Sequence, residues 1–168
     1  FSNSMILLLR HVSIVDPASP YNGRTADIHI LEGQIEAIGE RLQAPDAEVI
    51  DAEGAWCSTG WLDFGTQIGD PGFEHREDLH SLSEAALAGG YTALVCTPNT
   101  DPPIHSKAEI AYVLSQNRRS PVQLLPLGAL SMYCQGKDIT EMLDMRAAGA
   151  VAFSDGHAPV ASSGLMLR

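Results

Sequence analysis

The alternation of apolar and polar positions changes at about residue 60. Before this point, apolar residues form short runs interrupted by turn-forming residues, a pattern typical of β-strands. A hairpin is predicted around Glu32-Gly33, because apolar residues alternate with polar ones on both sides of this turn signal. A third short strand is predicted around Val49-Ile50. Residues 5–59 are therefore expected to form a small β module.

After residue 60, apolar runs alternate with amphipathic segments. The runs begin near Leu62, Thr92, Val122 and Val151. They recur about every 30 residues, which is the length that one strand and one helix of a parallel-stranded fold require. This spacing predicts four successive βα units.

Three helices are predicted between the runs: Glu77 to Ala88, about Lys107 to Asn117, and near Ile139 to Ala148. Ser106 and Glu109 have the spacing of a capping box at the start of the second helix. Asp138 and Glu141 predict the same device at the start of the third. Glycines directly after the first and third helices predict where these helices end.

Four βα units fit either a doubly wound sheet or the first half of a (β/α)8 barrel. No GxGxxG motif follows the first strand to favour a dinucleotide-binding fold. A complete barrel takes about 250 residues, so four units cannot close one, and an open half exposes strand edges. We therefore expect the chain to be incomplete, with Leu165 to Arg168 at the start of a fourth helix.

Composition narrows the range of partners. Ten Lys and Arg stand against 21 Asp and Glu, and the net charge of -11 argues against nucleic acid or an anionic membrane as partner. No stretch approaches the roughly 20 apolar residues of a membrane span. Cys57, Cys96 and Cys134 lack CxxC spacing, so buried thiols and a reducing cytoplasm are expected. Phe1 to Ser4, before Met5, are interpreted as the remnant of an expression tag.

Functional groups in parallel α/β folds gather at the carboxyl ends of the strands. The sequence blocks there resemble the dihydroorotase family of cyclic amidohydrolases, which has D-x-H-x-H-x-R-x-P-G after the first barrel strand, P-N-T after the second and F-S-D-D-G after the fourth. The positions in register are Asp63, Asp70-Pro71-Gly72, Glu77-Asp78, Gly89-Gly90, Pro98-Asn99-Thr100 and Phe153-Ser154-Asp155. The resemblance implies an α/β fold, with the N-terminal part of a TIM barrel at 60–168 after a small β-sandwich module at 5–59.

The departures from this family pattern bear on function. Its two metal-binding histidines correspond to Gly65 and Gln67, and the arginine for the substrate carboxylate corresponds to Gly69. Glycine offers no ligand, and an amide is a poor zinc ligand beside imidazole, carboxylate or thiolate. Asp155 matches a metal-binding aspartate, but Gly156 stands where a second Asp is usual. We therefore expect no catalytic residue and no cofactor on this chain, although the family uses zinc.

The vestigial metal-site positions are Asp63, Gly65, Gln67 and Asp155. Asn99 is a candidate contact for a substrate-like ligand, and turn chemistry alone also explains it. Asp155 and His157 are either a rudimentary ligand pair or a surviving turn. His75 and His80 are interpreted as solvated residues at a helix start rather than metal ligands.

The family reaction is the reversible hydrolysis and cyclisation that interconverts dihydroorotate and N-carbamoyl-aspartate in pyrimidine biosynthesis. The first hypothesis is an inactive homologue, expected to be a homo-oligomer and retained for assembly, with aspartate carbamoyltransferase as the partner that the resemblance suggests. One alternative is an active cyclic amidohydrolase with a non-standard metal site. Another is a small-molecule binding module.

Overall fold

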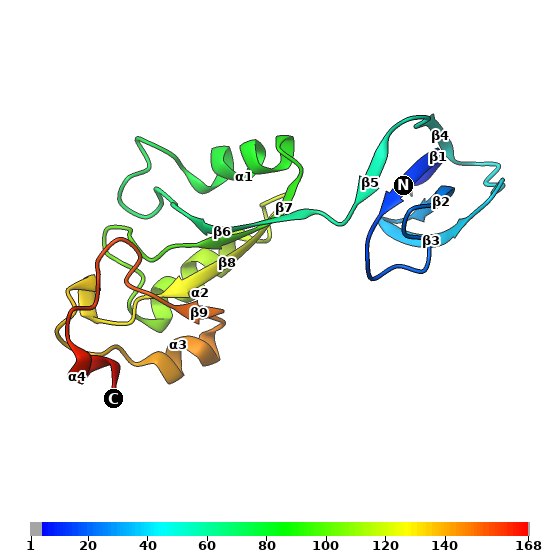
Figure 1. Cartoon of the computed structure of the whole chain (residues 1–168). Coiled ribbons are helices and arrows are strands. Elements are labelled where there is room, and N and C mark those ends of the chain that lie inside the picture. Colours follow the sequence, from blue (N-terminus) through cyan, green and yellow to red (C-terminus); the bar gives the residue numbers. More distant parts are fainter. Residues whose placement is uncertain (1–4, 168) are drawn as a thin grey trace. The chain divides into compact units, whose positions relative to one another are not determined.

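The computed structural model describes residues 5–167, and the chain divides into two compact units, Phe1–Thr59 and Gly60–Arg168 (Figure 1). The segment interpreted as a tag remnant lies outside the described residues. No helix within residues 5–167 is both long enough and apolar enough to span a membrane.

The first unit is one five-stranded sheet in the order β3-β2-β1-β4, with β5 also paired to β1. Its strands are β1 (Ile6–Val15), β2 (Thr25–Leu31), β3 (Gln34–Gly39), β4 (Glu48–Asp51) and β5 (Trp56–Ser58). The predicted hairpin is confirmed, because β2 and β3 pair antiparallel around Glu32-Gly33. No sequence pattern predicted β5, a three-residue strand that pairs in parallel with β1.

The second unit contains a four-stranded sheet in the order β6-β7-β8-β9, in which every neighbouring pair is parallel. Its strands are β6 (Trp61–Thr66), β7 (Tyr91–Cys96), β8 (Gln123–Gly128) and β9 (Ala152–Phe153). Each strand begins within one residue of its predicted start. Sequence order equals spatial order, as it does in the wall of a (β/α)8 barrel.

The helices of this unit are α1 (Leu79–Ala88), α2 (Lys107–Gln116), α3 (Met142–Ala148) and α4 (Ser163–Met166), with a short 3-10 turn, η1 (Met132–Cys134). α1 packs on β7, α2 packs on β8, and α3 packs on both α2 and β8. Buried apolar side chains fill the core between these elements, among them Leu94, Ile104, Ile110, Leu124 and Met145. α1, α2 and α3 thus each cover the sheet next to the strand before or after them, as βα units require.

The helix starts test the capping predictions. The capping box of Ser106 and Glu109 is present at the start of α2. The one predicted for α3 is wrong: this helix begins at Met142 and has no side-chain cap. The reason is tertiary, because Ile139 forms an isolated antiparallel bridge with Ser131 instead of entering the helix.

The prediction of buried thiols is right for one cysteine of three. Cys96 is fully buried in β7, and this burial raises the pKa of its thiol to about 12. Cys57 and Cys134 are only partly buried. The difference arises because β7 is an inner strand of its sheet, whereas Cys57 and Cys134 lie in short peripheral segments.

Replacing Ile110 by alanine is expected to lower the free energy of unfolding by about 2–5 kcal/mol, because this side chain of α2 is fully buried in the core of the second unit. The matched control is Leu143→Ala in α3, where the side chain is 82% exposed and the expected change is within about 0.5 kcal/mol. Urea denaturation of the intact protein measures both variants. Similar losses for the two would contradict this assignment of the core.

Candidate functional site

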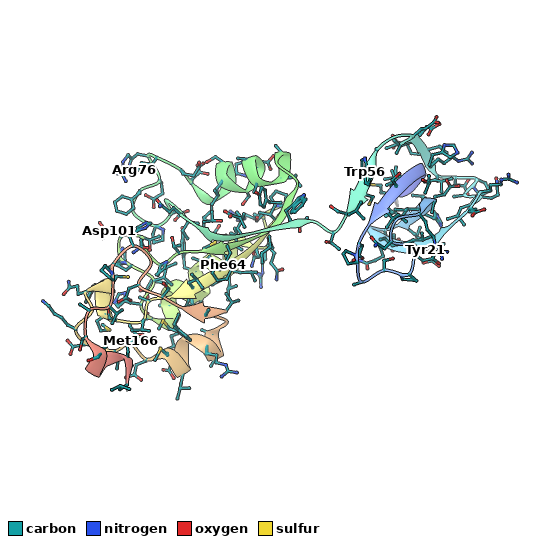
Figure 2. The ribbon with its side chains drawn as sticks, viewed as in Figure 1. Tyr21, Trp56, Phe64, Arg76, Asp101 and Met166 are labelled. Atoms are coloured by element: carbon teal, nitrogen blue, oxygen red, sulfur yellow. The ribbon has the colours of Figure 1, made fainter. Side chains whose placement is uncertain are left out.

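The candidate site lies at the carboxyl ends of the four parallel strands of the second unit. Parallel pairing places the loops that follow β6, β7, β8 and β9 along the same edge of the sheet. Figure 2 shows Arg76 and Asp101 in the first two of these loops. Of the predicted vestigial metal-site positions, Gln67 and Asp155 lie in these loops, Gly65 is the last but one residue of β6, and Asp63 lies in the middle of β6.

The end of β6 does not present a pair of ligands. Gly65 has a φ of +105°, and the register between β6 and β7 shifts between Phe64 and Thr66, which marks a bulge. Gln67 follows with an exposed side chain. The Asp63 carboxylate accepts a hydrogen bond of 2.5 Å from the hydroxyl of Thr66. Residue type and backbone conformation at position 65 therefore both depart from what a metal-binding histidine needs.

The loop after β6 folds tightly at the position of the family's arginine. A Cβ atom on Gly69 would lie 2.1 Å from the Glu77 carbonyl oxygen, so no side chain fits there. The Phe73 N–H donates to the Gly69 carbonyl at 2.6 Å, which holds the turn. The Tyr112 hydroxyl on α2 donates to the Asp70 carboxylate at 2.5 Å, and this bond raises the pKa of Tyr112 to about 12.

Asp155, after β9, is buried, and both oxygens of its carboxylate accept hydrogen bonds from the loop after β8. Oδ1 accepts the backbone N–H groups of Leu130, at 2.9 Å, and Ser131, at 2.8 Å. Oδ2 accepts the Ser131 hydroxyl at 2.5 Å. Burial of this carboxylate is thus compensated by three donors, as buried charges require.

Asn99 joins the loop after β7 to the segment that contains Asp155, after β9. Its Nδ2 donates to the Asp155 carbonyl at 3.1 Å, and its Oδ1 accepts the backbone N–H of His157 at 3.3 Å. A Cβ atom on Gly156 would lie 1.7 Å from Asn99 Oδ1, so the amide occupies the space that a side chain at position 156 would need. The structure therefore brings Asn99 and Asp155 together through hydrogen bonds within the protein.

The residues present do not fit the zinc that the family uses. Gly65 has no donor, Gln67 offers an amide, and both oxygens of Asp155 are already hydrogen-bonded. His75 and His80 are exposed, and so is His157. Across residues 5–167, no group of three or more His, Cys, Asp or Glu side chains is arranged to hold a metal ion.

Sequence reasoning missed Ser131, whose hydroxyl joins Asp155 to the loop after β8. This hydroxyl also accepts the backbone N–H of Gly136 at 2.7 Å. A signal existed, because Ser131 is the first polar side chain after the buried run of β8, just as Asp155 follows β9. The pairing of the two could not be read from the sequence, because 24 residues separate them.

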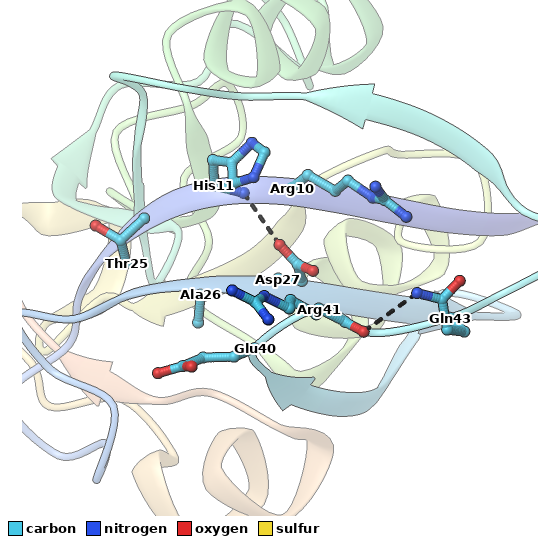
Figure 3. A pocket seen from close by; sticks show the side chains of 8 residues that line it. All are labelled: Arg10, His11, Thr25, Ala26, Asp27, Glu40, Arg41 and Gln43. Atoms are coloured by element: carbon cyan, nitrogen blue, oxygen red, sulfur yellow. Dashed lines mark hydrogen bonds between the residues drawn. The ribbon is translucent and has the colours of Figure 1, made fainter.

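The first unit has a cleft of about 430 Å³ that sequence reasoning did not single out (Figure 3). Its lining includes Arg10, His11, Asp27, Glu40 and Arg41. The buried Asp27 carboxylate accepts the backbone N–H of His11 and that of Leu42, which ties the bulge in β1 to the segment after β3. The lining combines both signs of charge, so its electrostatics favour no one class of ligand.

Comparisons with solved structures define the class of fold. An L-hydantoinase from Arthrobacter aurescens aligns over 96% of this chain and 37% of its own, with a TM-score of 0.76 and 24% identity. A dihydroorotase aligns over 88% of this chain and 41% of its own, with a TM-score of 0.61 and 18% identity. The chain accordingly shares the fold of part of each of these two proteins, with a curled parallel sheet that resembles part of a TIM barrel.

Sequence comparisons identify the family. The family described as "Dihydro-orotase-like" matches residues 58–168, and the chain belongs to it. A dihydroorotase of Thermoanaerobacter sp. (strain X514) is 40% identical over 98% of this chain, and one of Solibacter usitatus (strain Ellin6076) is 38% identical over 98%. The chain spans 38% of the length of each of these relatives.

Gly65→His is expected to lower the free energy of unfolding by about 1–3 kcal/mol, because a residue with a Cβ is strained at a φ of +105°. Gln67→His is the control: its side chain is exposed and the expected change is within about 0.5 kcal/mol. Chemical denaturation of the intact protein measures both. An equally small effect for the two would show that β6 accepts a histidine at position 65.

The ion pair of His11 and Asp51 is expected to make the stability of the first unit depend on pH. The 2.9 Å hydrogen bond to Asp51 raises the pKa of His11 above 6.5, and the same bond lowers the pKa of Asp51. The His11 contribution to stability is therefore complete below pH 6.5 and disappears as the pH rises through the raised pKa. The Asp51 contribution disappears as the pH falls through its lowered pKa.

Asp51→Asn is expected to move the pKa of His11 back toward 6.5, followed by NMR titration of the imidazole. Asp46→Asn, at an exposed acidic position in the same unit, is the control and should leave the titration unchanged. An unaltered His11 pKa in Asp51→Asn would show that the ion pair does not form in solution.

Proposed function

We propose that this member of the dihydroorotase-like family does not hydrolyse cyclic amides through the family's metal site and is retained for a structural role. The observation that carries the proposal is Gly65. It lies where the family places a metal-binding histidine, it has no donor atom, and its φ of +105° in a β-bulge disfavours any residue with a side chain.

The chemistry explains why this position matters. Amide hydrolysis near neutral pH depends on a metal that lowers the pKa of bound water to about 7 and polarises the carbonyl. Gly65 and Gln67 supply neither of the imidazoles that would hold this metal. The Asp155 carboxylate instead accepts hydrogen bonds from the loop after β8. Gly69 leaves no room for a side chain that could bind a substrate carboxylate.

The structural role that we propose is assembly. The candidate partner is aspartate carbamoyltransferase, within pyrimidine biosynthesis in the cytoplasm, and the candidate form of the protein is a homo-oligomer. The net charge of -11 fits a protein partner better than nucleic acid. Family membership supports this proposal, because the family reaction uses N-carbamoyl-aspartate, the product of that transferase.

One observation favours a second candidate, an active cyclic amidohydrolase with a non-standard metal site. One relative named dihydroorotase is 42% identical over 85% of this chain, and another of 40% identity is about two and a half times as long, because the chain spans 38% of it. Ligands on further strands would be the source of such a site.

Hydrolysis of dihydroorotate by the intact protein, with and without added zinc, separates the two candidates. We expect no metal-dependent turnover and less than one bound metal ion in ten chains, because the first-strand ligands are absent. Turnover that appears with zinc and disappears with a chelator would overturn the proposal. A dihydroorotase that retains its H-x-H pair, assayed in parallel, is the positive control.

Assembly needs its own measurement. The intact protein is mixed with aspartate carbamoyltransferase from the same organism, and the mass of the mixture is determined by size exclusion with light scattering. A stable complex at micromolar concentration is the expected result. If the two proteins elute from the mixture at the same positions as they do separately, aspartate carbamoyltransferase is not the partner.

A further inference from the structure

Asp155 contacts the loop edge through both its side chain and its backbone. Through its side chain it binds Leu130 and Ser131 after β8, and through its backbone carbonyl it binds Asn99 after β7. Its own position is after β9. Three loops from three neighbouring strands therefore meet at one residue.

The loop after β8 is strained in a way that needs an anchor. Tyr133 and Cys134 are consecutive non-glycine residues with φ values of +55° and +56°, a conformation that L residues rarely adopt. The Ser131 hydroxyl closes this segment by accepting the Gly136 N–H while it donates to Asp155. The strained turn is thus held from one side by a buried carboxylate.

We propose that Asp155 is a positioning residue that holds these three loops together without a metal ion; together with Ser131 and Asn99 it forms what we call the loop latch. The inference rests on the proposed function, because a carboxylate that accepts three hydrogen bonds is not free to bind zinc. Charge-assisted bonds to backbone N–H groups are stronger than neutral ones, which suits a carboxylate for this role.

Two cysteines report on the latch without any assay of turnover. Cys134 lies in the strained turn and is partly buried, whereas Cys96 is fully buried in β7. Opening of the loop alone would expose Cys134 and leave Cys96 protected. Unfolding of the whole unit would expose both.

The experiment is alkylation of the intact protein with iodoacetamide, with the rate at each cysteine followed by peptide mass mapping. Ser131→Ala removes the hydroxyl that joins Asp155 to Gly136 and is expected to raise the rate at Cys134 at least tenfold while Cys96 stays protected. Asp155→Ala should raise it further. Asp138→Asn, at an exposed position of the same loop, is the matched control and should match the wild type.

Ser131→Ala is the deciding variant for two reasons. Burial and, to a smaller extent, the Asp155 charge raise the pKa of Cys134 to about 11. Removal of that charge therefore changes the reactivity of the thiol even in a closed loop, whereas Ser131→Ala keeps the charge. It also leaves both backbone bonds to Asp155 Oδ1 in place, so the unit stays folded if Asp155→Ala does not.

A wild-type Cys134 rate that stays the same in excess chelator is the other expected result. A rate in Ser131→Ala equal to that of the wild type would overturn the latch, and so would a chelator that accelerates labelling of the wild type. These outcomes are independent of the dihydroorotate assay: zinc-dependent turnover with the expected labelling would remove only the proposed function. Absent turnover with unchanged labelling would remove only the latch.

Discussion

Parallel pairing of β6, β7, β8 and β9 is the constraint on which the candidate site depends. A parallel strand must be followed by a crossover before the next one begins, so every carboxyl end emerges on the same edge of the sheet. Residues that are 24 to 58 positions apart in the chain thereby come within hydrogen-bonding distance. The helices cover the sheet, and their buried apolar side chains are sufficient for that role.

The same edge that would assemble a metal site in a cyclic amidohydrolase is closed here by contacts within the protein. A metal ion can hold several loops at once because it accepts several ligands, and a buried carboxylate with several N–H and O–H donors can do likewise. Asn99 fills the space beside Gly156, and the turn around Gly69 fills the space of an arginine side chain. Loss of ligands and reorganisation of the loops are therefore consistent with one another.

Sequence predicted most of the second unit because its signals are local. Each strand start was found to within one residue, and the capping box of α2 lies within four consecutive residues. The predicted start of α3 near Ile139 was wrong, because a tertiary contact, the bridge between Ser131 and Ile139, overrides the local pattern. β5 was missed for a similar reason, since a three-residue strand has too little sequence to show alternation.

The order of the βα units, the family and the lack of histidines at positions 65 and 67 follow from the amino-acid sequence alone, because each of these is a matter of spacing or residue type. The role of Asp155, in contrast, depends on the folded chain. Its residue type allows metal ligation and hydrogen bonding equally, and the choice depends on which donors surround it. Those donors belong to Leu130 and Ser131, which reach Asp155 only once β8 and β9 are paired.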